Sequence, residues 1–426
     1  MRNLKNKRLL ISGEPDLIYD VVKKANEMGV YTILTGDYKD SPAKEIADES
    51  HQVSTANTDR MVAFAREKHA DGVLTQYIDS DLPNVQKVCK RLNLPFIATA
   101  EQLELIGNKK NAKDLFIEHG IPVPKEFNIT EELRDSDLDK VVYPVLTKPV
   151  DNSWQRGISI CKNRKELITG YRKALEFSES GNVLVEEYLE GDYVVLNFTL
   201  QDGFLSLSAL ADKPVMENNN SSESIRLPKG YILPSKYIDL FYDTLYSRFK
   251  DMFHTIGLKN GSVGVEAVVK DDIFYAFEMQ CRLGGMRHHQ FVFEETGMDI
   301  LKMHINYALT GRFAGWDVRT FDNPRFRKVH CLLNLLSNPG TISKIEVPKN
   351  ITSIPGIISY LPMHEVGDKI EQTGTVSEVF GKVALAADNE NRLIESIEKV
   401  HNELRVLDEN GSEMLLKTMT LDDLTS

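Results

Sequence analysis

The strongest constraint on the fold is a regular alternation of short apolar runs with amphipathic segments over residues 8–98. The runs RLLISG, VYTILTG and DGVLTQ have the length and composition of buried strands. They alternate with the helical segments DLIYDVVKKANEMG, TDRMVAFAREKHA and LPNVQKVCKRLN. Because parallel strands need crossover helices, this part of the chain predicts an α/β fold with a doubly wound parallel sheet. Gly13 follows the first strand without a GxGxxG pattern, which gives little support for a dinucleotide site.

From residue 141 onward the pattern changes to strands rich in β-branched and aromatic residues, joined by short polar turns such as QDG and KDD. A single helix, YIDLFYDTLYSRFKDMFHTIG, is expected to interrupt these strands. Residues 325–426 again contain strand-like runs, with a helix at NRLIESIEKVHNELRVL. The later part of the chain therefore predicts α+β material, and 426 residues are enough for several cores.

Composition narrows the choice of partners. The formal net charge of −12 argues against nucleic-acid binding, which needs a basic surface. Four cysteines lie far apart without a CxxC pair, as expected for reduced thiols in the cytoplasm. No apolar run approaches 18 residues, and the first residues lack the apolar stretch of a signal peptide. We therefore expect a cytoplasmic protein without a membrane span.

The segment SVGVEAVVKDDIFYAFEMQ predicts a β-hairpin with one polar face. Alternation places two sets of side chains on the apolar face: Val263, Val265, Ala267 and Val269, and Ile273, Tyr275, Phe277 and Met279. A three-residue connection at 271–273 would satisfy this pattern by pairing Lys270 with Phe274. The same register sets Glu266 directly opposite Glu278, with Gln280 beside them.

Opposed like charges destabilise a sheet, by roughly 4 kcal/mol for unit charges about 4 Å apart at an effective dielectric near 20. A divalent cation would offset this repulsion, because two carboxylates and an amide oxygen are hard ligands of the kind magnesium prefers. The alternative is a solvated sheet face on which the acids never meet. Arg282 follows on the same face and can bind phosphate bidentately, and Gly284 and Gly285 allow a close backbone approach.

A second group of cationic candidates comes earlier in the chain. Lys148 ends a strand and precedes the polar loop 151–157, whose backbone amides, Ser153, Arg156 and Gly157 could cradle phosphates. Lys213 ends the strand FLSLSALADK. The alternative for Lys148, as for Lys109, is a surface lysine with a solvated ammonium.

The run VLVEEYLEG leaves a strand at four residues that could present backbone groups to an adenine edge: Glu186, Glu187, Tyr188 and Leu189. An edge strand with exposed acids is the alternative.

In this order, these elements resemble the ATP-grasp superfamily, well over residues 1–310 and more loosely over 311–426. GVEAVV…FEMQCRLGG resembles the family's E…E-x-N-x-R-x-GG motif, and KPVDNSWQRG its phosphate loop. IGNKKNAKDLF is similar to its GDK-x-x-x-K helix start. The resemblance is to the amino-acid-ligase and carbamoyl-phosphate-synthase-like branch rather than to biotin-dependent carboxylases.

The resemblance implies a three-domain ATP-grasp architecture, in which two α+β lobes enclose ATP after an N-terminal parallel sheet. The implied boundaries are 1–105, 106–310 and 311–426. It implies Mg²⁺, with Mn²⁺ as an alternative, on Glu266, Glu278 and Gln280. ATP phosphates would contact Lys109 and Lys148, and the adenine would contact residues 186–189. Lys213 and Arg282 would act on the γ-phosphate.

Three positions depart from the family pattern. Gln280 replaces Asn, and Trp154 stands where the loop commonly has Gly. Tyr193 follows Gly191–Asp192 where the family often has Glu, so Asp192 or Asn197 would have to contact the ribose.

The activity implied is an ATP-dependent ligase that joins a carboxylic or amino acid to an amine through an acyl phosphate. Arg287 and His288 follow the glycines and are candidates for binding the acid, the alternative being a helix start with exposed charges. Two other functions stay open: an enzyme acting on bicarbonate or a nucleotide-biosynthesis intermediate, and a nucleotide-binding module with weak turnover. We expect small-molecule substrates, no nucleic-acid or membrane partner, and leave room for a homodimer.

Overall fold

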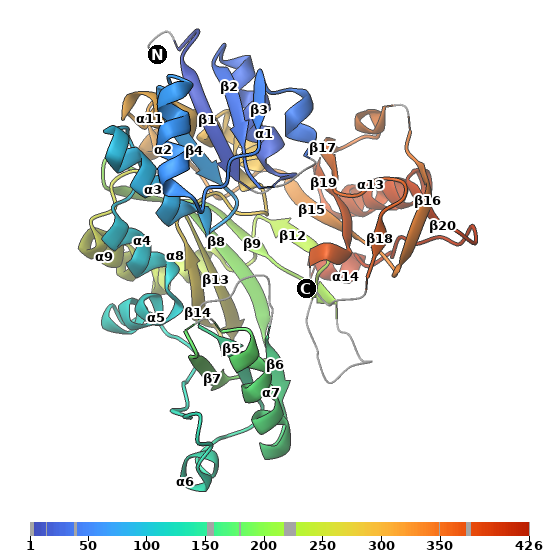
Figure 1. The fold of residues 1–426 in the computed structure, drawn as a ribbon. Coiled ribbons are helices and arrows are strands. Elements are labelled where there is room, and N and C mark those ends of the chain that lie inside the picture. The colour runs from blue at the N-terminus through green and yellow to red at the C-terminus, as the bar shows by residue number, and fades with distance from the viewer. Residues whose placement is uncertain are drawn as a thin grey trace.

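The structure, a computed structural model, describes residues 4–13, 15–37, 41–150, 157–178, 180–216, 227–348, 350–371 and 376–425. The predicted phosphate-loop residues Ser153 and Arg156, and Trp154, lie outside the described residues. Figure 1 shows an N-terminal domain above, a small β-lobe below and the C-terminal elements to one side of a large central sheet.

The N-terminal domain is built on a parallel sheet of order β3-β2-β1-β4. Its strands are β1 (Arg8–Gly13), β2 (Tyr31–Thr35), β3 (Glu49–His51) and β4 (Gly72–Gln76). The cores show that helices cover both faces, α2 and α3 on one and α1 and α11 on the other. These helices are α1 (Ile18–Glu27), α2 (Thr58–Glu67), α3 (Asp81–Leu92) and α11 (Ile300–Thr310). The doubly wound α/β prediction is confirmed, and α11 is contributed by a segment more than 200 residues farther along the chain.

The small lobe is an antiparallel sheet of order β6-β5-β7 covered by one helix. It contains β5 (Val145–Pro149), β6 (Ser159–Cys161), β7 (Val183–Glu187) and α7 (Arg164–Glu176). Three helices precede it: α4 (Ala100–Gly107), α5 (Lys109–Glu118) and α6 (Asp135–Leu138). Asn108 caps α5 by accepting from the backbone N–H groups of Lys110 and Asn111, so the predicted helix start at Lys109 is confirmed.

The large sheet has the order β14-β13-β8-β9-β12-β15-β19-β17, and all its neighbours are antiparallel. Its strands are β8 (Asp192–Gln201), β9 (Phe204–Asp212), β12 (Gly230–Leu233), β13 (Gly261–Lys270), β14 (Ile273–Gln280), β15 (Val329–Leu336), β17 (Ile357–Pro362) and β19 (Val379–Ala387). One face packs on the N-terminal domain and on α10 (His288–Thr296), and the other face packs on α4, α5, α8 and α9.

The single helix predicted at 237–257 is wrong, because the structure has α8 (Ile238–Thr244) and α9 (Tyr246–Ile256). The chain leaves regular helical geometry at Leu245, where φ is −128°. The hydroxyl of Thr244 donates to the carbonyl of Leu240 at 2.6 Å, and a back-bonded threonine of this kind bends helices.

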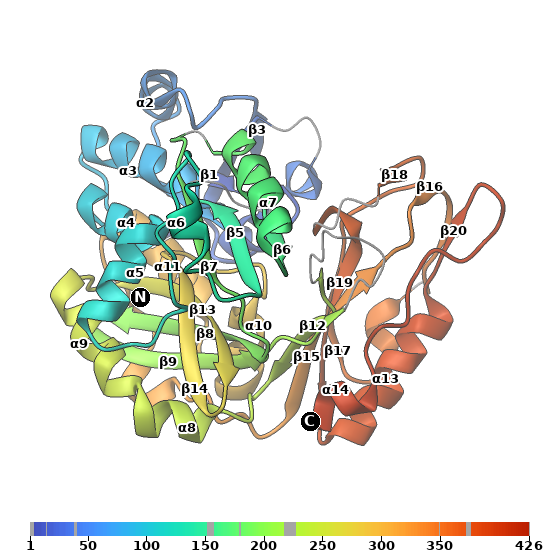
Figure 2. The same cartoon turned by 90° about the horizontal axis from the view of Figure 1, so that it is seen from below.

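The C-terminal elements continue the large sheet through β15, β19 and β17. They add a small sheet of order β18-β16-β20 and the helix α13 (Glu390–Glu403), which packs on the outer face. The further elements are β10 (Val215–Met216), β11 (Leu227–Pro228), β16 (Gly340–Glu346), β18 (Lys369–Ile370), β20 (Arg405–Asp408), α12 (Val318–Phe321) and α14 (Leu421–Thr425). Figures 1 and 2 both show these elements at the opposite end of the large sheet from α4, α5 and α9. The boundaries 1–105, 106–310 and 311–426 stay a prediction.

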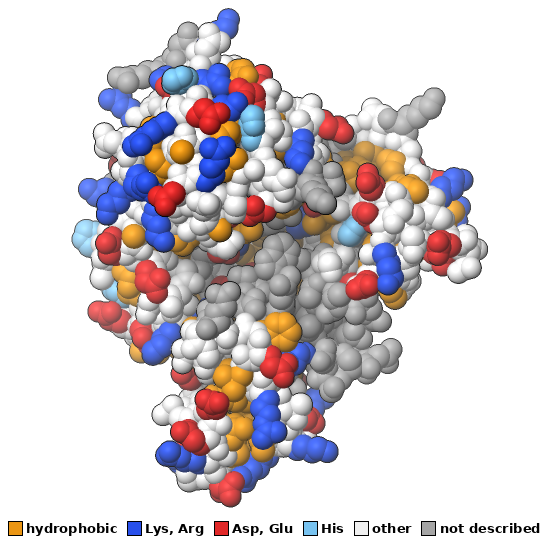
Figure 3. All heavy atoms as spheres, viewed as in Figure 1, with side chains coloured by type: hydrophobic (Ala, Val, Ile, Leu, Met, Phe, Trp, Pro, Cys, Tyr) orange, Lys and Arg blue, Asp and Glu red, His pale blue; other side chains and the backbone are white. Residues whose placement is uncertain are grey.

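Among the described residues, no helix is long and apolar enough to cross a membrane. On the face shown in Figure 3, lysine and arginine side chains are interspersed with acidic ones over the N-terminal domain and the small lobe.

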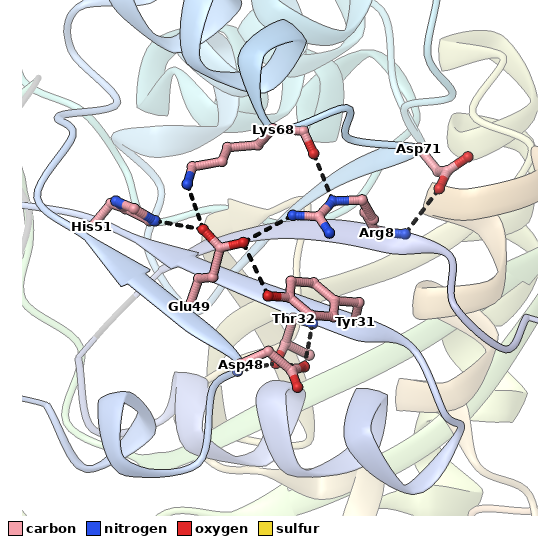
Figure 4. Close-up of polar contacts among 8 residues, drawn as sticks. All are labelled: Arg8, Tyr31, Thr32, Asp48, Glu49, His51, Lys68 and Asp71. Atoms are coloured by element: carbon pink, nitrogen blue, oxygen red, sulfur yellow. Dashed lines mark hydrogen bonds and ion pairs between the residues drawn. The ribbon is translucent and has the colours of Figure 1, made fainter.

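A polar network fixes the edge strand β3 to the rest of the N-terminal sheet (Figure 4). Glu49 accepts hydrogen bonds from Arg8 at 2.9 Å and from the Tyr31 hydroxyl at 3.0 Å, and contacts His51 and Lys68. The hydrogen bond from Lys68, followed by that from His51, lowers the pKa of Glu49 to about 2. A strand of three residues forms few backbone hydrogen bonds with its neighbour, so the Glu49 carboxylate is the main group that holds β3 on the sheet.

We expect Glu49→Gln to lower the free energy of unfolding at neutral pH. Because the pKa of Glu49 is depressed in the folded chain, its stabilisation is present above its ordinary pKa of 4.5 and is lost as pH falls toward about 2. Urea unfolding between pH 7 and pH 3 should therefore show the wild type converging on the variant. The exposed Glu395, paired only with Arg392, provides the control. A constant difference between wild type and Glu49→Gln across this range would contradict the expectation.

Candidate active site

The hairpin β13–β14 sets Glu266 opposite Glu278, as predicted, but by a different route. The connection has two residues, Asp271 and Asp272, with φ values of 51° and 57°, and Lys270 pairs with Ile273 instead of Phe274. Two-residue turns with both φ values positive match the twist of a hairpin, which explains the shorter connection. The predicted three-residue connection is therefore wrong.

A β-bulge restores the predicted pairing of the two acids. Ala267 pairs with Ala276 and Glu266 pairs with Glu278, so Phe277 is the extra residue of β14. The bulge also reverses the alternation, and the predicted apolar face of β14 is wrong on the turn side. The buried core residues of β14 and its extension are Phe274, Ala276, Met279 and Cys281, whereas Ile273 is 42% exposed.

Phe277 is consequently directed toward the small lobe. Its ring centroid lies 6.4 Å from that of Tyr193 and 5.9 Å from the Lys148 ammonium. This placement gives the region between the small lobe and the large sheet an aromatic side chain that sequence alternation assigned to the core.

Lys213 neutralises Glu266 in this structure. Its ammonium lies 2.7 Å from the Glu266 carboxylate, and its side chain is only 9% exposed. Burial alone would lower the pKa of Lys213, but the Glu266 charge outweighs it and the pKa is raised. Tyr231 on β12 completes this group, since its electrostatic interaction with Lys213 opposes the rise in its own pKa caused by burial. Sequence reasoning missed Tyr231.

Among the described residues, no ion pair within 4.0 Å is recorded for Glu278, in contrast to Glu266. Burial raises its pKa, and although Lys109 opposes the rise, the charges of Glu266 and Asp79 add to it. The group is therefore held in a setting that favours additional positive charge. Gln280 lies over Gly264, where a Cβ atom would stand 2.9 Å from the Gln280 side-chain nitrogen.

These residues fit a divalent cation, because two carboxylates on paired strands and an amide beside them supply oxygen ligands. The raised pKa of Glu278 shows that added positive charge would stabilise its ionised form. Among the described residues, no cluster holds three or more His, Cys, Asp or Glu side chains placed for a metal ion. Whether these three residues bind metal stays a prediction.

The predicted phosphate lysine Lys148 shares a carboxylate with Lys113. Glu186 lies 2.5 Å from the Lys148 ammonium and 2.6 Å from that of Lys113, which also lies 3.1 Å from Glu126. All three side chains of the Lys148–Glu186–Lys113 group are buried. Burial alone would raise the pKa of Glu186, but the two ammonium groups lower it, Lys148 foremost. Lys113 is the last lysine of the segment that resembles GDK-x-x-x-K, and its interpretation as a helix-surface charge is wrong because its side chain is buried.

The predicted adenine segment ends β7. The backbone N–H groups of Glu187 and Tyr188 donate to the carbonyls of Lys125 and Pro144 at 2.8 and 3.0 Å. A cavity of about 320 Å³ lies against this segment. Its lining includes Tyr143, Pro144, Glu187, Tyr188 and, from the large sheet, Lys270. The adenine contacts of residues 186–189 stay a prediction, as does any phosphate contact of Gly157. Of the ribose candidates, Asp192 accepts from the Tyr237 hydroxyl, and Asn197 is buried.

The loop 282–287 brings the two remaining candidates against the N-terminal domain. Arg282 forms a two-point ion pair with Asp79, at 2.8 and 2.5 Å. Arg287 does the same with Asp20, at 2.9 and 2.8 Å, and is 3% exposed. His288 is 1% exposed, and burial lowers its pKa to about 3. The acid-binding roles of Arg287 and His288 stay predictions, and both residues are enclosed by protein here.

Residues 141–290 match the family model described as ATP-grasp domain. The chain is 22% identical over 321 residues to the 2-oxoglutarate carboxylase small subunit of Hydrogenobacter thermophilus, covering 71% of this chain and 66% of that protein. The chain thus spans slightly less than two thirds of that relative's length. The chain carries an ATP-grasp domain.

Solved structures extend this likeness over nearly the whole chain. The L-amino acid ligase from Bacillus licheniformis has a TM-score of 0.77 at 19% identity, covering 95% of this chain and 100% of that one. The biotin carboxylase domain of the Hydrogenobacter thermophilus enzyme, in complex with MgADP and bicarbonate, has a TM-score of 0.76 at 20% identity, covering 96% and 91%. The three-domain ATP-grasp fold is therefore confirmed, and the two scores do not separate the amino-acid-ligase branch from the carboxylases.

We expect Gly264→Ala to disturb the metal site without unfolding the hairpin. The new Cβ would meet the flexible end of Gln280 at 2.9 Å, so this side chain must move while the backbone stays in place. The unfolding temperature should change by no more than about 1–2 °C, the shift that roughly 1 kcal/mol produces in a chain of 426 residues. The Mg²⁺ concentration giving half-maximal nucleotide-dependent activity should rise several-fold.

Gly107→Ala is the matched control, because a Cβ there meets no atom within 4 Å. An unchanged Mg²⁺ requirement in Gly264→Ala would remove Gln280 from the proposed metal site.

Proposed function

We propose that this protein is an ATP-dependent ligase that joins a small carboxylic or amino acid to an amine through an acyl phosphate, releasing ADP and phosphate. The observation that carries the proposal is the polar face of the β13–β14 hairpin. Glu266 and Glu278 are directly paired there, and the Lys213 ammonium forms an ion pair with Glu266. The ATP-grasp domain match and the ligases and carboxylases among the similar proteins support it.

In the proposed mechanism, Glu266, Glu278 and Gln280 would hold Mg²⁺, which supplies charge neutralisation at the phosphates. Lys113 and Lys148, fixed by Glu186, provide positive charge for the nucleotide, and Lys148 lies next to Phe277. The acid's carboxylate attacks the γ-phosphate, and Lys213 and Arg282 stabilise the charge that develops on the transferring group. An amine then displaces phosphate from the acyl phosphate. Closure around the site would exclude water, which otherwise hydrolyses this intermediate.

A second function is favoured by one observation. The curated relative is named a carboxylase subunit, and the similar biotin carboxylase domain is described with bicarbonate. Bicarbonate could therefore take the place of the acid, with carboxyphosphate as the intermediate.

The four cysteines are free and buried, which supports the prediction of a cytoplasmic protein.

A phosphate-release screen tests the function directly. We expect wild-type protein with MgATP to release phosphate only when a particular acid, or bicarbonate, is present, and faster with its amine partner. Glu278→Ala should abolish this release at any Mg²⁺ concentration, whereas Glu395→Gln should behave as wild type. MgATP binding without phosphate release over a broad panel of acids, bicarbonate and amines would instead favour a nucleotide-binding module.

Arg282→Ala should separate chemistry from binding. Removing one preorganised charge from a transferring group costs roughly 10²–10³-fold in kcat for comparable sites. The Kd for MgATP, measured by calorimetry, should stay within about threefold of wild type, because the adenine and lysine contacts are untouched. A variant with wild-type kcat would exclude Arg282 from the reaction.

A further inference from the structure

The loop that carries Arg282 is held by both flanking parts of the molecule. From the N-terminal domain, Asp79 pairs with Arg282, Asp20 pairs with Arg287, and the Gln76 side chain accepts from the Leu283 N–H at 2.8 Å. From the C-terminal elements, Lys382 on β19 donates to the Gly285 carbonyl at 3.0 Å. The six-residue loop therefore has four anchors outside its own strand.

Buried hydrogen bonds extend this attachment into the fold. Gln76 ends β4, and its amide nitrogen lies 3.2 Å from the ring of His304 on α11. His304 in turn lies 2.9 Å from the Ser262 hydroxyl on β13. The end of β4, from which Asp79 follows three residues later, is thus fixed relative to the strand that carries Glu266.

The Asp79 carboxylate occupies one particular edge of the Arg282 guanidinium. It accepts from Nε at 2.8 Å and from Nη2 at 2.5 Å, while Nη1 donates to the Leu283 carbonyl at 3.1 Å. A guanidinium has five N–H donors, so two remain, one on each Nη atom. Among the described residues these two have no recorded partner. Arg282 therefore keeps one N–H donor on each Nη atom, which is the number needed to bind two oxygens of one anion.

Two acids of the preceding hairpin are alternative partners for an Arg282 guanidinium that is not held by Asp79. Glu266 and Glu278 are paired directly across the hairpin that precedes the loop carrying Arg282. A guanidinium released from Asp79 would be attracted to those acids and would occupy the place of a cation.

We infer that Asp79 is a positioning residue. It holds the guanidinium of Arg282 by Nε and Nη2, so that the remaining N–H groups of Nη1 and Nη2 face the oxygens of the transferring phosphoryl group. The inference rests on the proposed phosphoryl transfer, and it assigns the loop after β4 a role in the active site. The Asp79 side chain is 37% exposed and the Arg282 side chain only 10%, so the acid lies nearer the protein surface than the arginine.

The test is a double-mutant cycle with inorganic orthovanadate as the probe, bound in the presence of MgADP to mimic the transferring group. Asp79→Asn keeps the shape of the side chain but removes the charge and turns an N–H₂ group toward Nη2. We expect it to weaken vanadate binding about tenfold in the Arg282 background and less than twofold in Arg282→Ala. Asp79→Ala should behave in the same way. Coupling of this kind identifies residues that act as a unit.

Asp59→Asn is the matched control, since it breaks the exposed pair with Arg91 in the same domain. Equal losses from Asp79→Asn in both Arg282 backgrounds would assign Asp79 a purely structural role, and so would tight vanadate binding by both Asp79 variants. Absence of vanadate binding by the wild type would also overturn the inference. Because this readout needs no acid substrate, it fails independently of the phosphate-release screen that tests the ligase function.

Discussion

The repulsion between Glu266 and Glu278 is the constraint around which this molecule is organised. Two carboxylates on directly paired strands are tolerated only if positive charge stands close by. In this structure Lys213, which follows β9, supplies it to Glu266, and the charges of Lys109 and Lys148 act on Glu278. Burial and the neighbouring acids raise the pKa of Glu278, so this carboxylate is the member of the pair that gains most from added positive charge.

The same principle extends to four described cations of the candidate site. Lys148 and Lys113 share Glu186, Lys213 lies on Glu266, and Arg282 is held by Asp79. A buried ion without a partner costs several kcal/mol, so internal counterions keep these groups in place before a nucleotide binds. An anionic ligand must then exchange partners with the protein, and its net affinity is the difference between the two sets of contacts. Arg282 is the exception, because its pair with Asp79 uses one edge and leaves another for the ligand.

The sequence predicted those parts of the fold and site that depend on local pattern. Strand–helix alternation identified the parallel sheet, and the spacing of Glu266 and Glu278 identified their pairing. Sequence-based prediction failed where the conformation of single backbone residues determines the structure. The bulge at Phe277 and the two-residue turn compensate for each other, so a wrong connection still led to the right pair of acids. The break at Leu245 is a local departure of the backbone from helical geometry, which the periodicity of the side chains does not contain.

The spacing of residues in the sequence could not predict contacts between distant segments of the chain. Asp79 and Arg282 are 203 residues apart, and Asp20 and Arg287 are 267 apart. Neither acid lies in a motif, and each is recognisable only because β1 and β4 end at the same edge of the N-terminal sheet. That edge receives the loop 282–287, since α11 packs on the same sheet and draws the chain after β14 toward it. The N-terminal domain therefore contributes to the candidate active site through the geometry of its strand ends, and a site described from the hairpin alone lacks the acids that orient its arginines.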